Sequence, residues 1–148
     1  MLQLEHINLV VNDMPAALRF YQAAFPHWRI REQGEGPWYG KPRKWLHLGD
    51  DYQYLTLNDN GEGESRDLAG HQPGLAHFGF VTHNLDALVE RMRAAGFEIS
   101  HTGAEEVFRR NVYFVDPSGM EIEFVEYISD MPAQRNLSGL PAEKGAAQ

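Results

Sequence analysis

The chain has 148 residues, a formal net charge of −8 and 43% apolar residues, and it contains no cysteine. The length predicts one domain with a sizeable core, and no apolar run approaches the roughly 18 residues of a membrane-spanning helix. The acidic charge argues against a nucleic-acid surface, which needs clustered Lys and Arg. Without cysteine, disulfides, thiolate zinc sites and iron–sulfur clusters are excluded, so His, Asp and Glu remain as possible metal ligands.

The first 58 residues predict a module of one strand, one helix and three further strands. An apolar, branched run ends at Asn12, and Asp13 is a good helix cap with Pro15 near the first helical position. A Gly/Pro-rich loop is expected at residues 34–42. The strands are expected at residues 4–11, 28–31, 44–48 and 52–57, and the helix at residues 16–25.

The same order of elements restarts after a polar linker at residues 59–73. His77 repeats the position of His6, and Asn84 repeats the helix cap Asp13, at one offset (77 − 6 = 71). Strands are expected at residues 75–81, 97–100, 109–115 and 120–126, and a helix at residues 84–95. The sequence therefore predicts an α+β fold in which two βαβββ modules pair into one pseudo-symmetric structure. The modules are residues 2–58 and 74–127, followed by a tail at residues 128–148.

A β-hairpin at residues 113–127 carries one candidate ligand. Its turn at residues 116–119 reads DPSG, in which Pro fixes φ and Gly admits a positive φ. In the second arm Glu123 alternates with apolar residues, and the period alone leaves open whether it points inward or into solvent. Glu121 and Glu126 are expected to be solvated.

Two histidines strengthen the case for a metal site. His6 and His77 hold the same position on the first strand of each module, so a pseudo-twofold axis can bring them together. A lone His on an apolar strand is usually a hydrogen-bonded core residue, but a repeat-matched pair favours ligands. Two imidazoles and the carboxylate of Glu123 suit a catalytic divalent ion such as Fe(II), Mn(II) or Zn(II). The alternative is three unrelated polar residues on half-exposed strands.

Three motifs, LEHINLVV, LAHFGF and DPSGMEIEF, resemble those of the vicinal oxygen chelate superfamily, and the resemblance covers residues 2–127. This group includes glyoxalase I, fosfomycin-resistance transferases, extradiol dioxygenases and bleomycin-binding proteins, so the resemblance implies a fold and not one reaction. The implied fold is a partly closed mixed β-barrel with flanking helices. The implied site is one divalent metal ion (Fe, Mn, Zn or Ni) held by His6, His77 and Glu123, and a homodimer is expected.

Several positions depart from familiar members of that group. Glyoxalase I uses a fourth protein ligand where Tyr54 is expected here, and a neutral phenol is a poor ligand; Gln53 would serve only after a register slip. Tyr113 matches a substrate-side tyrosine of extradiol dioxygenases, but their further histidines are missing, one of them where residues 104–106 lie. The basic cluster that holds a phosphonate in fosfomycin-type transferases is not visible.

The sequence predicts a metal-dependent enzyme that binds a small substrate through adjacent oxygens, with isomerase, lyase and dioxygenase chemistry left open. Tyr54 and Tyr113 are the expected catalytic proton donors. The expected substrate-binding residues are Asn8, Trp45, His47 and Arg109. The alternative is a metal-free binding protein of the bleomycin-resistance type that uses the same cavity. The N-terminus lacks the pattern of a secretion signal, so a cytoplasmic location is expected.

Overall fold

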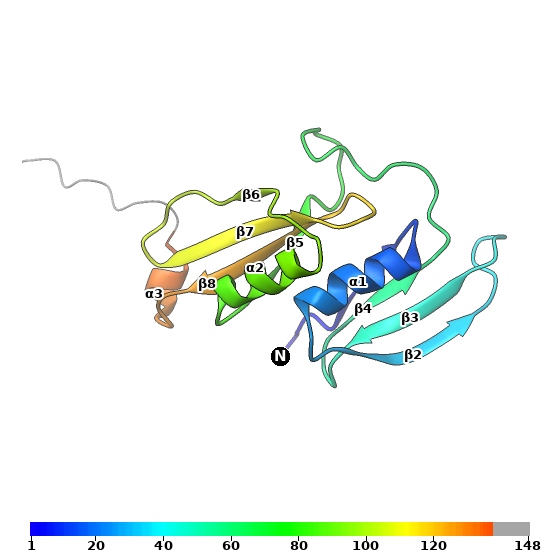
Figure 1. Ribbon diagram of the computed structural model, residues 1–148, viewed down its shortest axis with the longest axis horizontal. Coiled ribbons are helices and arrows are strands. Elements are labelled where there is room, and N and C mark those ends of the chain that lie inside the picture. The colour runs from blue at the N-terminus through cyan, green and yellow to red at the C-terminus, as the bar shows by residue number, and fades with distance from the viewer. Residues whose placement is uncertain (138–148) are drawn as a thin grey trace, which may run out of the picture.

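A computed structural model describes residues 1–137 of the chain, and its elements follow the predicted β-α-β-β-β order twice (Figure 1). The first repeat comprises β1 His6–Val10, α1 Met14–Ala24, β2 Arg29–Glu35, β3 Lys44–Gly49 and β4 Tyr54–Asn58. The second comprises β5 His77–Val81, α2 Leu85–Ala94, β6 His101–Thr102, β7 Arg109–Val115 and β8 Glu121–Tyr127. A short helix, α3 Pro132–Arg135, follows β8. The predicted tail lies partly outside the described residues, and the predicted module boundaries stay predictions.

The strands form two four-stranded mixed sheets with the same topology. Their orders are β1-β4-β3-β2 and β5-β8-β7-β6, with the first pair of each sheet parallel and the others antiparallel. The predicted α+β class is therefore confirmed. The expected partly closed barrel is not: within residues 1–137 no strand pairing joins the two sheets, and closure requires continuous pairing around the barrel. β1 and β5 are each paired along one edge only.

Two strands differ from the sequence prediction. β2 extends through Gly34, which was assigned to a loop, and Gly34 pairs with Trp45 of β3. Glycine leaves room there for the Trp45 ring, because a Cβ on Gly34 would come within 2.8 Å of Trp45 Cζ2. The strand expected at residues 97–100 begins instead at His101. The side chains of Phe97 and Ile99 pack against the core, and pairing with β7 starts only beyond them.

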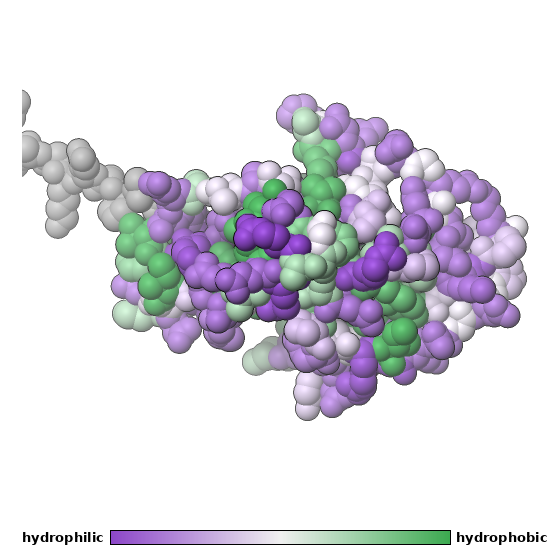
Figure 2. All heavy atoms as spheres, in the orientation of Figure 1, coloured by the Kyte–Doolittle hydropathy of each residue, from purple (hydrophilic) through white to green (hydrophobic). Residues whose placement is uncertain are grey.

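Both predicted helix caps are present. The side chain of Asp13 accepts a hydrogen bond from the Ala16 N–H at 2.9 Å, and Asn84 accepts one from Ala87 at 3.0 Å. Gly96, with φ 91°, follows the end of α2. The outward faces of the helices contribute to a largely hydrophilic surface, with small apolar patches (Figure 2). No helix in residues 1–137 is long and apolar enough to cross a membrane.

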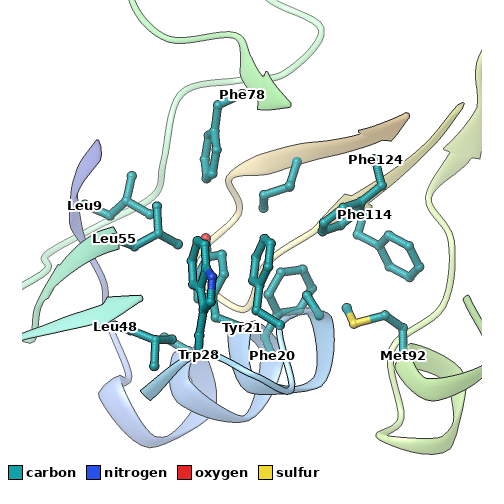
Figure 3. Packing of buried hydrophobic residues seen from close by; sticks show 14 of the residues in the cluster. Leu9, Phe20, Tyr21, Trp28, Leu48, Leu55, Phe78, Met92, Phe114 and Phe124 are labelled. Atoms are coloured by element: carbon teal, nitrogen blue, oxygen red, sulfur yellow. The ribbon is translucent and has the colours of Figure 1, made fainter. Parts of the chain in front are cut away.

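One core is shared by both modules. Strand alternation turns one face of each sheet toward the helices, and the buried side chains come from these faces and from the inward sides of α1 and α2 (Figure 3). On α1, the ring of Phe20 meets Phe97 at 5.0 Å and Phe114 at 6.4 Å between centroids, so the first helix packs on the second module. Burying one such ring contributes about 2–3 kcal/mol. The opposite face of each sheet does not contribute to this core.

A buried polar contact also links the modules. The Tyr21 hydroxyl on α1 donates a hydrogen bond of 2.7 Å to Asp116 in the β7–β8 turn. Burial, and then the charge and hydrogen bond of Asp116, raise the pKa of Tyr21 well above its usual value. Folding therefore favours the neutral phenol.

Tyr21→Phe should flatten the loss of stability at alkaline pH. Because folding raises the pKa of Tyr21, its contribution is complete below about pH 10, the usual tyrosine pKa, and is lost as the pH rises further, at up to about 1.4 kcal/mol per pH unit. Urea unfolding from about pH 8 to 11 measures this slope. Tyr52→Phe, at an exposed tyrosine, is the control and should keep the wild-type slope. Equal slopes for Tyr21→Phe and wild type would contradict the prediction.

Candidate functional site

The outer face of the second sheet brings two of the three predicted ligands together. Ile122 and Phe124 point into the core, so alternation places Glu121 and Glu123 on the other face, beside His77 of β5. The Nε2 atom of His77 lies 3.2 Å from Oε2 of Glu123, and its Nδ1 lies 3.5 Å from Oε1 of Glu121. The two carboxylate side chains are only 18% and 15% exposed. Glu123 thus faces neither the core nor bulk solvent, and the expectation that Glu121 is solvated is wrong.

Three residues that the sequence analysis did not single out complete this face. Asn111 of β7 donates a hydrogen bond of 2.7 Å from its amide to Oε1 of Glu123, and its amide also lies 3.2 Å from the Tyr113 hydroxyl. The ring of His101 stacks on Tyr113 at 4.2 Å. The third is Glu121. Two of them could have been predicted from strand alternation. Asn111 stands two residues before Tyr113, and Glu121 two residues before Glu123, so each shares a sheet face with a predicted site residue.

Tyr113 is a neutral phenol at the edge of the His77–Glu123 pair. Partial burial and then the negative charge of Glu123 raise the pKa of Tyr113 above its usual value. The phenol keeps its proton at neutral pH and can donate it as a hydrogen bond. This chemistry agrees with the donor role predicted for Tyr113, which stays a prediction.

His6 lies on the outer face of the first sheet. Its Nδ1 atom is 3.1 Å from Glu5, and its ring stacks on Tyr54 at 4.8 Å with 13° between the planes. Within residues 1–137, no group of three or more His, Cys, Asp or Glu is placed to hold a metal. We call His6 the first candidate half-site and the His77–Glu123 pair the second candidate half-site.

A run of rings in contact crosses the first sheet; the His6–Tyr54 pair is stacked and the other two pairs are tilted. Tyr54 contacts His47 at 4.6 Å between ring centroids, and His47 contacts Trp45 at 4.9 Å. The guanidinium of Arg31 lies 4.6 Å above the Tyr54 ring. We call His6, Tyr54, His47 and Trp45 the ring ladder. Burial lowers the pKa of His47. The charge of Glu32 opposes this shift, whereas Arg31 and His6 add to it, so the imidazole of His47 is mostly neutral at pH 7.

Two other predicted substrate residues have protein partners. Asn8, on the same strand face as His6, accepts a hydrogen bond of 2.5 Å from the fully buried amide of Asn58. Arg109 forms a bidentate ion pair with Glu106 in the loop before β7, one of whose bonds measures 2.7 Å. Their predicted roles with substrate stay predictions.

The register of the sheets corrects the expected position of a fourth ligand. His6 pairs with Tyr54, as His77 pairs with Glu121, so Tyr54 does not correspond to Glu123. Glu123 lies opposite Gly79, two residues beyond His77; the matching position in the first sheet is Thr56, opposite Asn8. The error arose because the first module is four residues longer between these strands (54 − 6 = 48 against 121 − 77 = 44), whereas matching Tyr54 to Glu123 allows for only two. Thr56 is buried, and its neutral hydroxyl is a weak metal ligand.

The His77–Glu123 pair fits a divalent ion. Neighbouring donors with metal bonds of about 2.1 Å and angles of about 90–109° lie roughly 3.0–3.4 Å apart. The separation of 3.2 Å between Nε2 and Oε2 falls in this range, although a direct ion pair has the same spacing. An imidazole and a carboxylate are ligands that Mn, Fe and Zn accept. The pair supplies two ligands, and a third from His6 would complete the predicted set.

The chain was compared with known proteins. Residues 3–124 match the family model of the Glyoxalase/Bleomycin resistance protein/Dioxygenase superfamily. No match was found among curated proteins.

Similar folds occur among solved structures. A glyoxylase/bleomycin resistance protein/dioxygenase domain from Frankia sp. EAN1pec is 24% identical, with TM-score 0.68, covering 86% of this chain and 98% of that one. A glyoxalase family protein from Enterococcus faecalis is 19% identical, with TM-score 0.69 and coverage of 84% and 97%. The fosfomycin resistance protein FosX from Listeria monocytogenes, a mutant complexed with Mn(II) and 1S,2S-dihydroxypropylphosphonic acid, is 20% identical, with TM-score 0.67 and coverage of 91% and 98%.

Proposed function

Because the chain belongs to the Glyoxalase/Bleomycin resistance protein/Dioxygenase superfamily, we propose that it is a divalent-metal-dependent enzyme acting on a small molecule with two adjacent oxygens. Its metal ligands are His6, His77 and Glu123. The observation that carries the proposal is the pairing of His77 Nε2 with Glu123 Oε2 at 3.2 Å on a sheet face turned away from the core. The Mn(II) bound to FosX, which has a similar fold, adds support.

The third ligand comes from a second copy of the chain. His6 and the His77–Glu123 pair lie on different sheets, and β1 and β5 each have one unpaired edge. Val10 and Val81, on the same strand faces as His6 and His77, are 42% and 54% exposed and are available for such a contact. Association of two chains would cover these faces and join the half-sites. A symmetric dimer would then contain two equivalent centres.

The residues around the two half-sites suit proton-transfer chemistry. A divalent ion held there supplies polarisation of the two substrate oxygens and compensates negative charge. The neutral Tyr113 phenol donates a hydrogen bond to a substrate oxygen, while the neutral imidazole of His47 accepts a proton. Trp45 gives a flat wall for the carbon skeleton. This set of groups supports isomerase or lyase chemistry.

The ring ladder favours one other function. Aromatic and imidazole rings in contact with one another beside Arg31 would also bind a flat ligand in a metal-free binding protein. In that case His77 and Glu123 would form an ion pair only. The two functions differ in whether a metal is required.

Metal content tests the proposed function. Untagged wild-type protein, reconstituted with Mn(II), Fe(II), Zn(II) or Ni(II), should retain about one ion per chain by plasma mass spectrometry, whereas His77→Ala should lose nearly all of it. Glu126→Gln, on the same strand as Glu123 but bonded to Arg110, is a control outside the candidate ligand set that should retain the metal. No metal in the wild type under any condition would overturn the enzyme proposal in favour of the binding protein.

A further inference from the structure

Both ring nitrogens of His77 face carboxylates. Nε2 lies 3.2 Å from Glu123, and Nδ1 lies 3.5 Å from Glu121. We infer that Glu121 and Asn111 are positioning residues, which orient His77 and Glu123 toward a divalent cation held between Nε2 and Oε2. The inference rests on the proposed metal site and assigns roles to two residues outside its ligand set.

Glu121 fixes the tautomer of His77. The two residues are directly paired across the parallel strands β5 and β8, so their backbones hold the side chains next to each other. Only 15% of the Glu121 side chain is exposed, which reduces screening of its charge. When a cation is bound by Nε2 and Glu123, the ring proton must lie on Nδ1, and the carboxylate of Glu121 beside Nδ1 would stabilise that tautomer.

Asn111 fixes the orientation of the Glu123 carboxylate. Its amide donates a 2.7 Å hydrogen bond to Oε1, so the carboxylate keeps Oε2 directed at His77. Asn111 is itself confined by Gly103, whose N–H bonds to the Asn111 carbonyl at 3.1 Å. A Cβ on Gly103 would lie 1.8 Å from the Asn111 side-chain oxygen. Position 103 therefore leaves room for Asn111 in this orientation.

The first half-site has a partly similar arrangement. Nδ1 of His6 lies 3.1 Å from Glu5, so each candidate ligand histidine has a carboxylate beside the same ring nitrogen. Glu5 is the neighbouring residue on the chain and is 62% exposed, so it constrains its histidine less than Glu121 does. The comparison identifies Glu121 as the stronger positioning group.

The test is the affinity of the purified protein for Co(II), measured by calorimetry and by the visible absorption of the bound ion. Glu121→Ala should weaken binding about 10- to 100-fold, and Glu121→Gln should recover much of this because its amide oxygen can accept a hydrogen bond from the Nδ1–H group. Glu126→Ala removes an acid from the same strand, where it pairs with Arg110, and should bind as the wild type does. The Co(II) spectrum should change in Glu121→Ala and not in Glu126→Ala, since a purely structural role for Glu121 would leave it unaltered.

Asn111 is tested from two directions. Asn111→Ala removes the hydrogen bond to Glu123. Gly103→Ala displaces the Asn111 side chain but leaves its amide group in place on the chain. Both variants should weaken Co(II) binding by about tenfold. Circular dichroism and thermal unfolding establish that each variant is folded. Wild-type affinity and spectrum in folded Glu121→Ala and Asn111→Ala would overturn the positioning roles and leave the metal site standing. Failure of the wild type to bind any metal would overturn both proposals.

Discussion

A dimer of one His6→Ala chain and one Glu123→Ala chain should bind about half as much metal as the wild-type dimer, whereas each variant alone should bind little. If His6 of one copy joins His77 and Glu123 of the other, the mixed dimer contains one complete centre and one that lacks two ligands. A centre built within one chain would be damaged in both copies. Metal recovery in the mixed dimer therefore separates the two arrangements.

The mixed dimer can be purified after co-expression of the two chains with different affinity tags, and its metal content measured by plasma mass spectrometry. The matched control pairs His77→Ala with Glu123→Ala. These residues belong to the same half-site, 3.2 Å apart in one chain, so mixing cannot restore either centre. Recovery in the control, or none in the His6→Ala and Glu123→Ala mixture, would contradict a centre shared between copies.

Local chemistry in the sequence was sufficient for most of the fold. The caps Asp13 and Asn84, the stop at Gly96 and the turn at residues 116–119 each act within a few residues, and all are found where they were expected. The repeat offset then gave the second module from the first. The position of β6 was missed because Phe97 and Ile99 pack on the core, which depends on the tertiary structure.

The candidate site was less predictable because it depends on the register of the strands. The sequence spacing matched Tyr54 to Glu123. In the structure Tyr54 pairs with His6 as Glu121 pairs with His77, so Tyr54 corresponds to Glu121. Glu121 looked like a solvated residue, and only the neighbouring strand reveals the histidine beside it. The joining of His6 with His77 and Glu123 was expected within one pair of modules. Within residues 1–137 no such group of three is formed, and the contacts with a second copy that the proposed centre requires are not encoded by any local pattern.

Asp116→Ala should lower the free energy of unfolding by about 3–5 kcal/mol, a large effect for a residue outside the candidate centre. Its side chain is 4% exposed and accepts three hydrogen bonds. One comes from Tyr21 on the first module, and two come from the N–H groups of Ser118 and Met120 in the β7–β8 turn. Alanine would leave a buried hydroxyl and the turn amides without this acceptor.

Two further variants show how this loss divides between the turn and the contact between modules. Tyr21→Phe removes only the 2.7 Å contact between modules and should cost about 1–2 kcal/mol, while Asp116→Asn keeps an acceptor oxygen and should fall between the other two variants. Urea unfolding gives each value, and the double variant Tyr21→Phe/Asp116→Ala gives the coupling energy. A loss below about 1 kcal/mol for Asp116→Ala would contradict the prediction. Because β8 also carries Glu123, a loosened turn should weaken metal binding too, which would link the packing of the first helix to the chemistry of the second sheet.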